Sequence, residues 1–213
     1  MSVLHDVATT IRQHSPMPLT AAGLPSRLNV LMAAPHPDDF DAVAVTMRYL
    51  YDAGHAIHVA VVRTGSGVED SYLSPPTLAN KSAAREREQR ESCRFFGLSD
   101  KNLVFLDLEQ DSDAQPLDNE PNRACIAERI HAISADLVFL PHGNDTNAGH
   151  RAMYQLVLRN LAETGRTILT CLNRDPKTIS MSINAYMPFG NETATWKKNL
   201  LRYHDSQQQR NLH

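Results

Sequence analysis

Residues 28–41 read LNVLMAAPHPDDFD. The first part of this segment is mostly apolar, and Pro35 ends the apolar run. A short apolar run bounded by proline is typical of a strand buried inside a sheet. An imidazole and three carboxylates follow it within six residues, from His36 to Asp41. The segment therefore predicts a buried strand whose carboxyl end carries the chemistry.

The rest of the chain repeats this alternation of strand and helix. Short apolar runs predict further strands at 57–62, 103–106, 137–140 and 167–172. Helical spacing of apolar residues predicts helices at about 42–53, 78–96, 123–133 and 149–163, and a polar helical tail from residue 192 onward. Strands alternating with helices imply right-handed βαβ units. We therefore expect an α/β fold with a Rossmann-like, mostly parallel sheet, helices on both faces, and one domain over residues 1–213.

Composition limits the class of protein. The chain has 213 residues, of which 42% are hydrophobic and 21% charged, and its net charge is −3. This balance is ordinary for a globular protein and does not call for nucleic acid or an anionic membrane as partner. The three cysteines are far apart and the amino-terminal segment has no long apolar run. We therefore expect a cytoplasmic protein with no disulfide framework and no membrane insertion; a homo-oligomer is left open.

A second polar cluster follows the predicted strand at 137–140. Residues 141–151 read PHGNDTNAGHR, which adds two histidines and a carboxylate. In open parallel sheets, ligands bind outside the carboxyl ends of the strands, so both clusters belong to one edge. Two histidines and one aspartate around an open position are typical of a catalytic zinc site. Zinc lowers the pKa of a bound water towards neutral and polarises a bound carbonyl.

Spacing suggests roles for individual side chains. His36 and Asp39 are three residues apart, so one tight turn can direct both at one ion, with His150 as the third ligand. Asp38 then points elsewhere and is suited to act as general base on the water. Asp41 or Asp145 would orient a ligand, although helix capping explains Asp41 equally well. The charged run at 85–91 is most simply a solvated helix face.

The motifs resemble those of the LmbE-like/PIG-L family of zinc-dependent N-deacetylases. Pro-His-Pro-Asp-Asp after a hydrophobic strand is the most specific of them, at residues 35–39. The supporting positions run to the end of the chain: Arg85, Glu88, Phe96-Gly97, Asp145, His150-Arg151-Ala152, Lys197 or Lys198, Leu200, His204, Ser206 and Gln207.

The resemblance implies one zinc ion per chain at His36, Asp39 and His150, with Asp38 as general base. Iron or manganese is the alternative to zinc. The resemblance also implies hydrolysis of an N-acetyl or other N-acyl group, often on a glucosamine-containing small-molecule conjugate. Within this reading, Arg85 and Asp145 are assigned to substrate binding, and Asp41 to the orientation of a ligand.

Two departures from the family pattern bear on catalysis. Phe40 stands where many members have Glu, and the acid comes one residue later. More importantly, Asn147-Ala148-Gly149 replaces a His-Pro-Asp whose histidine often stabilises the oxyanion or protonates the leaving amine. Asn147 can donate a hydrogen bond but cannot act as an acid, and His142 is the candidate to replace that histidine. Both are therefore assigned to catalysis beside Asp38.

Three alternatives remain. One is hydrolysis of a non-sugar amide, and another is a metal-binding, catalytically impaired module, which the departure at residues 147–149 favours. A nucleotide-binding Rossmann protein is disfavoured, because no Gly-x-Gly-x-x-Gly follows the first strand. Related chains often continue beyond the point where this one ends, at residues 210–213, so a further C-terminal segment is also left open.

Overall fold

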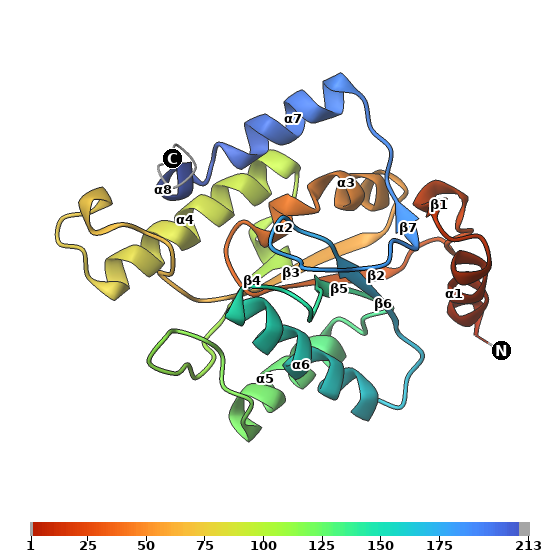
Figure 1. Cartoon of the computed structure of the whole chain (residues 1–213), viewed down its shortest axis with the longest axis horizontal. Helices are drawn as coiled ribbons and strands as arrows, with labels where there is room; N and C mark the ends of the chain where they lie inside the picture. The colour runs from red at the N-terminus through yellow and green to blue at the C-terminus, as the bar shows by residue number, and fades with distance from the viewer. Residues whose placement is uncertain (1, 209–213) are drawn as a thin grey trace.

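The computed structural model describes residues 2–208, and the expectation about a further C-terminal segment lies outside this range. Its centre is a five-stranded sheet in which every neighbouring pair is parallel (Figure 1). The strands, in spatial order, are β4 (Leu103–Leu106), β3 (Ala56–Val62), β2 (Asn29–Ala34), β5 (Leu137–Pro141) and β6 (Leu169–Asn173).

The strand order creates a crevice beside β2. From β2 the chain builds β3 and β4 on one side of the sheet and then returns to build β5 and β6 on the other. The direction of winding therefore changes between β2 and β5, which lie side by side. Loops leave the carboxyl ends of these two strands in opposite directions, and such a switch point is where open α/β sheets bind ligands.

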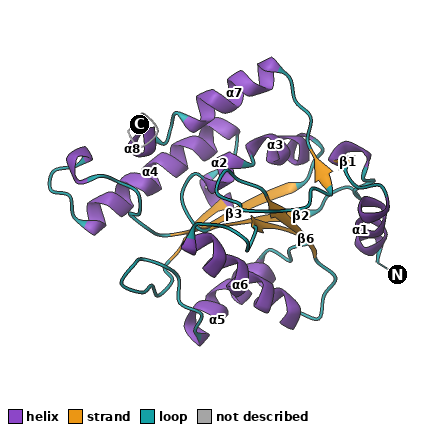
Figure 2. Cartoon of the chain, viewed as in Figure 1, coloured by secondary structure: helices purple, strands orange, loops and turns teal. Residues whose placement is uncertain are grey.

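Side chains of β2 alternate between two cores. Val30 and Met32 pack on the face covered by α2 (Asp39–Ala42), α3 (Ala44–Asp52), α4 (Leu78–Phe96) and α7 (Asn191–Leu201). Leu31 and Ala33 pack on the other face, under α5 (Glu120–Ala132) and α6 (Ala148–Glu163) (Figure 2). This confirms the expected α/β fold with helices on both faces of a mostly parallel sheet.

The two ends of the chain add smaller elements. Helix α1 (Val3–Gln13) precedes β1 (Met17–Pro18), which pairs in parallel with β7 (Ala185–Tyr186) from the segment between β6 and α7. Helix α8 (Asp205–Gln208) lies beside α4 (Figure 1). Single 3₁₀ turns, η1 (Leu19–Ala21), η2 (Asp70–Tyr72) and η3 (Asp100–Asn102), complete the described elements. Within residues 2–208, none of the helices combines the length and the apolar character needed to cross a bilayer.

The structure contains one helix that the sequence did not predict. The helix predicted over 42–53 corresponds to α3, and the short α2 precedes it; the two join at Val43, where φ is −104° and ψ is 13°. Asp38 precedes α2 with φ at +109°, a left-handed conformation that is uncommon for a residue other than glycine. The break lets the short α2 place its carboxylates at the crevice while α3 buries Met47 and Leu50 in the core.

Candidate metal centre

Three side chains meet where β2 and β5 end. Nδ1 of His36 lies 3.3 Å from Oδ2 of Asp39, and Nε2 of His150 lies 3.4 Å from the other carboxylate oxygen of Asp39. One nitrogen or oxygen from each residue falls within 4.8 Å of the others, a spacing that suits a shared ion. The structure thus brings together the three ligands expected from the sequence, two from the loop after β2 and one from the start of α6.

Local hydrogen bonds hold this cluster in place. Oδ2 of Asp39 accepts from the backbone N–H of His36 at 2.8 Å, which closes the turn between the two residues. Oδ1 of Asn147 accepts from the backbone N–H groups of Gly149 and His150, at 2.8 and 3.4 Å. Asn147 is therefore the N-cap of α6, and the cap fixes the point at which His150 enters the crevice.

Two further carboxylates lie behind His150. Its Nδ1 is 3.2 Å from Oδ2 of Asp145 and 3.4 Å from Oδ2 of Asp175. Asp145 is buried, with Thr178 and the backbone N–H of Asn147 as further donors to it. The structure therefore places Asp145, which the sequence assigns to substrate binding, against a candidate ligand rather than at the open edge.

The electrostatics of the cluster favour a cation. Burial lowers the pKa of His150, but the surrounding carboxylates outweigh it and raise the pKa to about 9. Burial likewise opposes ionisation of Asp39, yet hydrogen bonds from His150 and His36 hold its pKa well below its usual value. A site that attracts a proton so strongly onto an imidazole attracts a divalent ion for the same reason. Two imidazoles and one carboxylate are donors that zinc accepts.

Asp38 lies beside the cluster but faces a different partner. Its Oδ1 accepts from Nη2 of Arg85 at 3.0 Å, and its backbone N–H donates to Oε1 of Gln89 at 3.0 Å. The carboxylate is 35% exposed at the crevice. Burial raises the pKa of Asp38, and the guanidinium of Arg85 opposes this rise. The structure thus places Asp38 outside the group formed by His36, Asp39 and His150, with its carboxylate paired to Arg85.

The charged run at residues 85–91 of α4 differs from the solvated helix face predicted for it. Arg85, Glu88 and Gln89 are buried, so the segment is not the solvated helix face that its composition indicated. Each of them has a partner distant in sequence. Nη2 of Arg85 also donates to the carbonyl oxygen of Pro37, and Glu88 accepts from the backbone N–H and the hydroxyl of Ser206, both at 2.7 Å. The charged side chains of this run thus connect α4 to the loop after β2 and to α8.

Asp41 is fully buried in the same region. It accepts from the hydroxyl of Ser92 at 2.6 Å and from Nε2 of Gln89 at 3.3 Å, and it contacts Nε2 of His204. These partners belong to α4 and to the turn before α8, and none of them is one of the three candidate ligands. Asp41 therefore anchors α2 to the helical layer.

His142 lies apart from the ligand cluster. Its Nδ1 accepts from the backbone N–H of Asn144 at 3.0 Å, which leaves the ring proton on Nε2. His142 lines a cavity of about 670 Å³ on the side of β5 and β6. A smaller pocket contains Asp39 and His150, and it adjoins the large cavity at Ala42 and Val43.

Asp175 was not anticipated from the sequence. It follows β6, and the order of the sheet places that strand next to β5. The available signal is a carboxylate three residues beyond the end of the predicted strand at 167–172. That signal is weak in isolation, because most such carboxylates only cap turns.

Comparison with known proteins gives a family match. The family model described as GlcNAc-PI de-N-acetylase (PIG-L) matches residues 31–161. The comparison with curated proteins found no match.

Solved structures with a similar fold include deacetylases and a hydratase. N,N'-diacetylchitobiose deacetylase from Pyrococcus horikoshii is 20% identical over 84% of this chain and 70% of that chain, with a TM-score of 0.61. The A40926 pseudoaglycone deacetylase is 18% identical over 85% of this chain and 83% of that chain, with a TM-score of 0.66. The 4-carboxy-2-hydroxymuconate hydratase from Pseudomonas putida is 18% identical over 85% and 75%, with a TM-score of 0.54. At these identities, the similarity shows that the chains share a fold.

Proposed function

Because the chain belongs to the PIG-L family of LmbE-like proteins, we propose that it is a metal-dependent N-deacetylase. Its substrate in this proposal is an N-acetyl or other N-acyl amide of a glucosamine-type or related conjugate. His36, Asp39 and His150 would hold one zinc ion per chain. The observation that carries the proposal is the convergence of these three ligand atoms within 4.8 Å, beside a fourth group, Asp38, that does not join them.

The ligand geometry supports this assignment. Nδ1 of His150 is taken by Asp145 and Asp175, so Nε2 is the nitrogen directed towards Asp39 and the candidate ion. Metal-bound histidines usually donate their second ring N–H to a carboxylate, which fixes the ring and raises its basicity. When bound, zinc would supply an acidified water and a polarised carbonyl oxygen.

The residues of the chain then move the protons. Asp38 accepts the proton of the attacking water, and burial keeps its pKa above the usual value for an aspartate, which makes it a stronger base. Arg85 holds the carboxylate by its Nη2. Its other guanidinium nitrogens, Nε and Nη1, are buried without a partner among residues 2–208. We propose that Arg85 positions Asp38 for proton transfer.

The leaving amine needs a proton, and two groups are available. Protonated Asp38 returns the proton that it took from water. His142 carries its ring proton on Nε2 and is the second candidate donor. Asn147 has its side-chain oxygen engaged in the cap of α6, so only its amide N–H remains to stabilise the oxyanion.

A second candidate function is a metal-binding module without turnover. Asn147 acts as a helix cap, Gly149 has no side chain, and His142 lies outside the ligand cluster. These observations favour a centre that retains its ligands and lacks an efficient acid. The two candidates agree on metal content and differ on turnover.

The experiment measures both quantities on the same protein. The chain is purified without chelator, its metal content is measured by mass spectrometry, and amine release is followed on a panel of N-acetylglucosamine conjugates and non-sugar amides. The proposal expects one zinc per chain and chelator-sensitive release. Asp38→Asn keeps the metal and loses release, His36→Ala loses both, and Asp52→Asn, at an exposed carboxylate on α3, changes neither. Stoichiometric zinc without release on any amide supports the second candidate, and no bound metal contradicts both.

A further inference from the structure

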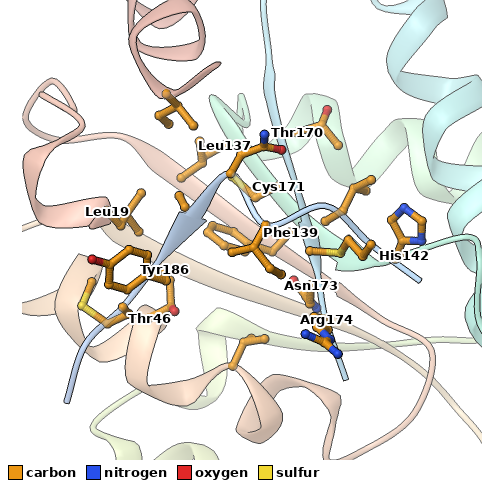
Figure 3. A pocket seen from close by; sticks show the side chains of 18 of the residues that line it. Leu19, Thr46, Leu137, Phe139, His142, Thr170, Cys171, Asn173, Arg174 and Tyr186 are labelled. Carbon is orange, nitrogen blue, oxygen red and sulfur yellow. The ribbon is translucent and has the colours of Figure 1, made fainter. Parts of the chain in front are cut away.

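The large cavity beside the metal centre has apolar walls. Its volume is about 670 Å³, within the range of pockets that enclose drug-sized ligands. One wall is formed by the β5 and β6 side chains that face α1, among them Phe139 and Cys171 (Figure 3). The opposite wall is the segment 181–189, which returns from β6 towards α7. Helix α1 contributes Ile11.

The segment 181–189 is built to cover this cavity. Its apolar residues alternate with polar or exposed ones, so that every second side chain is half-buried. The half-buried set is Met181, Ile183, Ala185 and Met187, and the exposed set is Ser182, Asn184, Tyr186 and Pro188. This is the period of an extended chain with one face inward. These four alternate apolar side chains line the cavity, and Ala185 and Met187 also pack against the cluster of Val7, Leu19 and Ala22.

The cavity adjoins the candidate metal centre. The small pocket around Asp39 and His150 and the large cavity share four lining residues: Ala42, Val43, Asn173 and Arg174. Figure 3 shows His142, Asn173 and Arg174 on one side of the cavity and Leu19 and Tyr186 on the other. A group that extends from the candidate ligands past Ala42 and Val43 would therefore reach the cavity on the side of His142, Asn173 and Arg174.

The two sides of the metal centre differ in polarity. The loops after β3 and β4 lie on the opposite side of β2 from β6. One of these loops brings Oε1 of Gln115 close to Gly149, where it is buried without a hydrogen-bond donor among residues 2–208. In the described part of the chain, the cavity lining contains neither Asp nor Glu; its charged side chains are Arg12, Arg174 and Lys197, and most of its other side chains are apolar. A hydrocarbon chain therefore fits the cavity side better than the Gln115 side.

We propose that this cavity binds the acyl chain of the scissile amide, so that the preferred substrate is a medium-chain N-acyl amide rather than an N-acetyl one. This inference rests on the proposed amide hydrolysis. The five residues of β6 that line the cavity span ~13 Å at about 3.3 Å per residue, which is long enough for a linear chain of medium length. Hydrolysis forms a C–O bond from water to the carbonyl carbon and breaks the C–N bond. The fatty acid leaves as a carboxylate, and the amine departs with the proton.

The test compares acyl chains on one amine. Release of glucosamine is measured from N-acetylglucosamine and N-decanoylglucosamine with the zinc-loaded protein. Each buried methylene contributes about 0.8 kcal/mol, roughly a fourfold factor, so eight additional methylenes are expected to raise kcat/KM by at least about 30-fold after losses to chain ordering. Equal kcat/KM values for the two substrates overturn the proposal.

A substitution in the cavity tests whether the preference for the longer acyl chain arises there. Thr46→Phe places a ring in the cavity from α3. It is expected to reduce kcat/KM for the decanoyl substrate at least tenfold and to change that for the acetyl substrate less than about twofold. The matched control is Thr195→Phe, the same replacement at an exposed position of α7 that does not line the cavity. Equal effects of the two variants contradict the proposal.

Two further measurements separate this inference from the proposed function. If no amide is hydrolysed, decanoate and acetate binding to the zinc-loaded protein is measured by calorimetry. Tighter decanoate binding that Thr46→Phe weakens supports the cavity assignment on its own, and equal affinity overturns it. A decyl glycoside of N-acetylglucosamine places the hydrocarbon on the amine side instead. Preference for that compound over the N-decanoyl amide assigns the cavity to the amine side and also overturns the proposal.

Discussion

Oδ2 of Asp145 lies 3.2 Å from Nδ1 of His150, while the opposite nitrogen of the same ring faces Asp39 at 3.4 Å. Asp145 therefore determines which nitrogen of His150 is directed at the candidate ion. Groups in this position typically change metal affinity by about 10–100-fold when they are replaced.

Asp145→Asn tests this relationship. The amide keeps the size of the side chain but removes the negative charge behind the imidazole. We expect zinc affinity to fall by about 10–100-fold, measured by competition with a chromophoric chelator. Asp100→Asn, at an exposed carboxylate that pairs with Arg94, serves as the control and leaves the affinity unchanged. Equal affinity in wild type and Asp145→Asn would show that Asp175 alone orients the ring.

Gly149→Ala tests how tightly the ligands are packed. A Cβ at this position would lie 3.0 Å from Nε2 of His36 and 3.0 Å from Oε1 of Gln115. The His36 ring then has to move, and overpacking of about 1 kcal/mol corresponds to roughly fivefold weaker zinc binding. Alanine stabilises a helix by about 1 kcal/mol relative to glycine. This gain offsets the overpacking in the free energy of unfolding, so we expect the variant to lose zinc affinity but little thermal stability. Gly190→Ala is the control, since a Cβ there meets nothing within 4 Å. Unaltered zinc affinity in Gly149→Ala would mean that His36 is not a ligand.

Asp38→Asn tests the assignment of the general base. Loss of a general base lowers turnover by about 10²–10⁴-fold. The ligands keep their geometry, so zinc content stays at the wild-type level. Turnover is measured as amine release, and metal by mass spectrometry on the same sample. A variant that loses its zinc would instead make Asp38 a ligand.

Asp38→Gly and Asp38→Ala together test the strained backbone. Both variants lose the carboxylate and its contact with Arg85, but only glycine adopts φ of +109° without a Cβ clash. Since a left-handed conformation costs about 1–2 kcal/mol for other residues, we expect Asp38→Gly to be the more stable of the two by about 1 kcal/mol. Urea unfolding of the metal-free proteins measures the difference. Equal stability would mean that the turn relaxes around alanine.

His204→Asn tests the contact between the turn before α8 and α2. Burial lowers the pKa of His204, but the adjacent Asp41 outweighs it and leaves the pKa above its usual value of 6.5. A raised pKa in the folded state means that the pair stabilises the fold fully below pH 6.5 and loses this contribution as the pH rises through the shifted value. Removing one partner of a buried pair costs about 3–5 kcal/mol.

The stability difference between wild type and His204→Asn should therefore be largest below pH 6.5 and shrink at alkaline pH. It is measured by urea unfolding across this range. His131→Asn, an exposed histidine on α5, is expected to show no such dependence. A difference that is independent of pH would mean that the imidazole is neutral in the folded protein.

Much of the fold follows from local periodicity. The predicted helix over 78–96 and strand over 103–106 have the bounds of α4 and β4, because Gly97 ends one and an unbroken apolar run defines the other. Two strand ends with histidines and carboxylates suffice to anticipate that His36, Asp39 and His150 come together, since parallel strands share an edge.

The remainder depends on contacts between distant parts of the chain. The charge pattern of residues 85–91 indicates a solvated helix face, and only the arrangement in space of the loop after β2 and of Ser206 buries Arg85 and Glu88. The break at Val43 likewise depends on how α2 packs against α7. Asp175 joins the centre because β6 lies beside β5, which a carboxylate in a loop does not reveal.

The docking of α8 connects the helices beside the site to residues that are synthesised much later. Glu88 accepts a hydrogen bond from Ser206, which lies 118 residues later in the chain, and Asp41 contacts His204, which lies 163 residues later. At ~5–20 residues per second a ribosome needs roughly 6–24 s to make the first of these intervals. During that time β4, β5 and β6 are still being synthesised, so these partners of Glu88 and Asp41 are made only after the last strand of the central sheet. A chain that ends before residue 204 lacks both partners of these buried carboxylates, so it should be less stable in urea and more sensitive to proteases than the 213-residue chain.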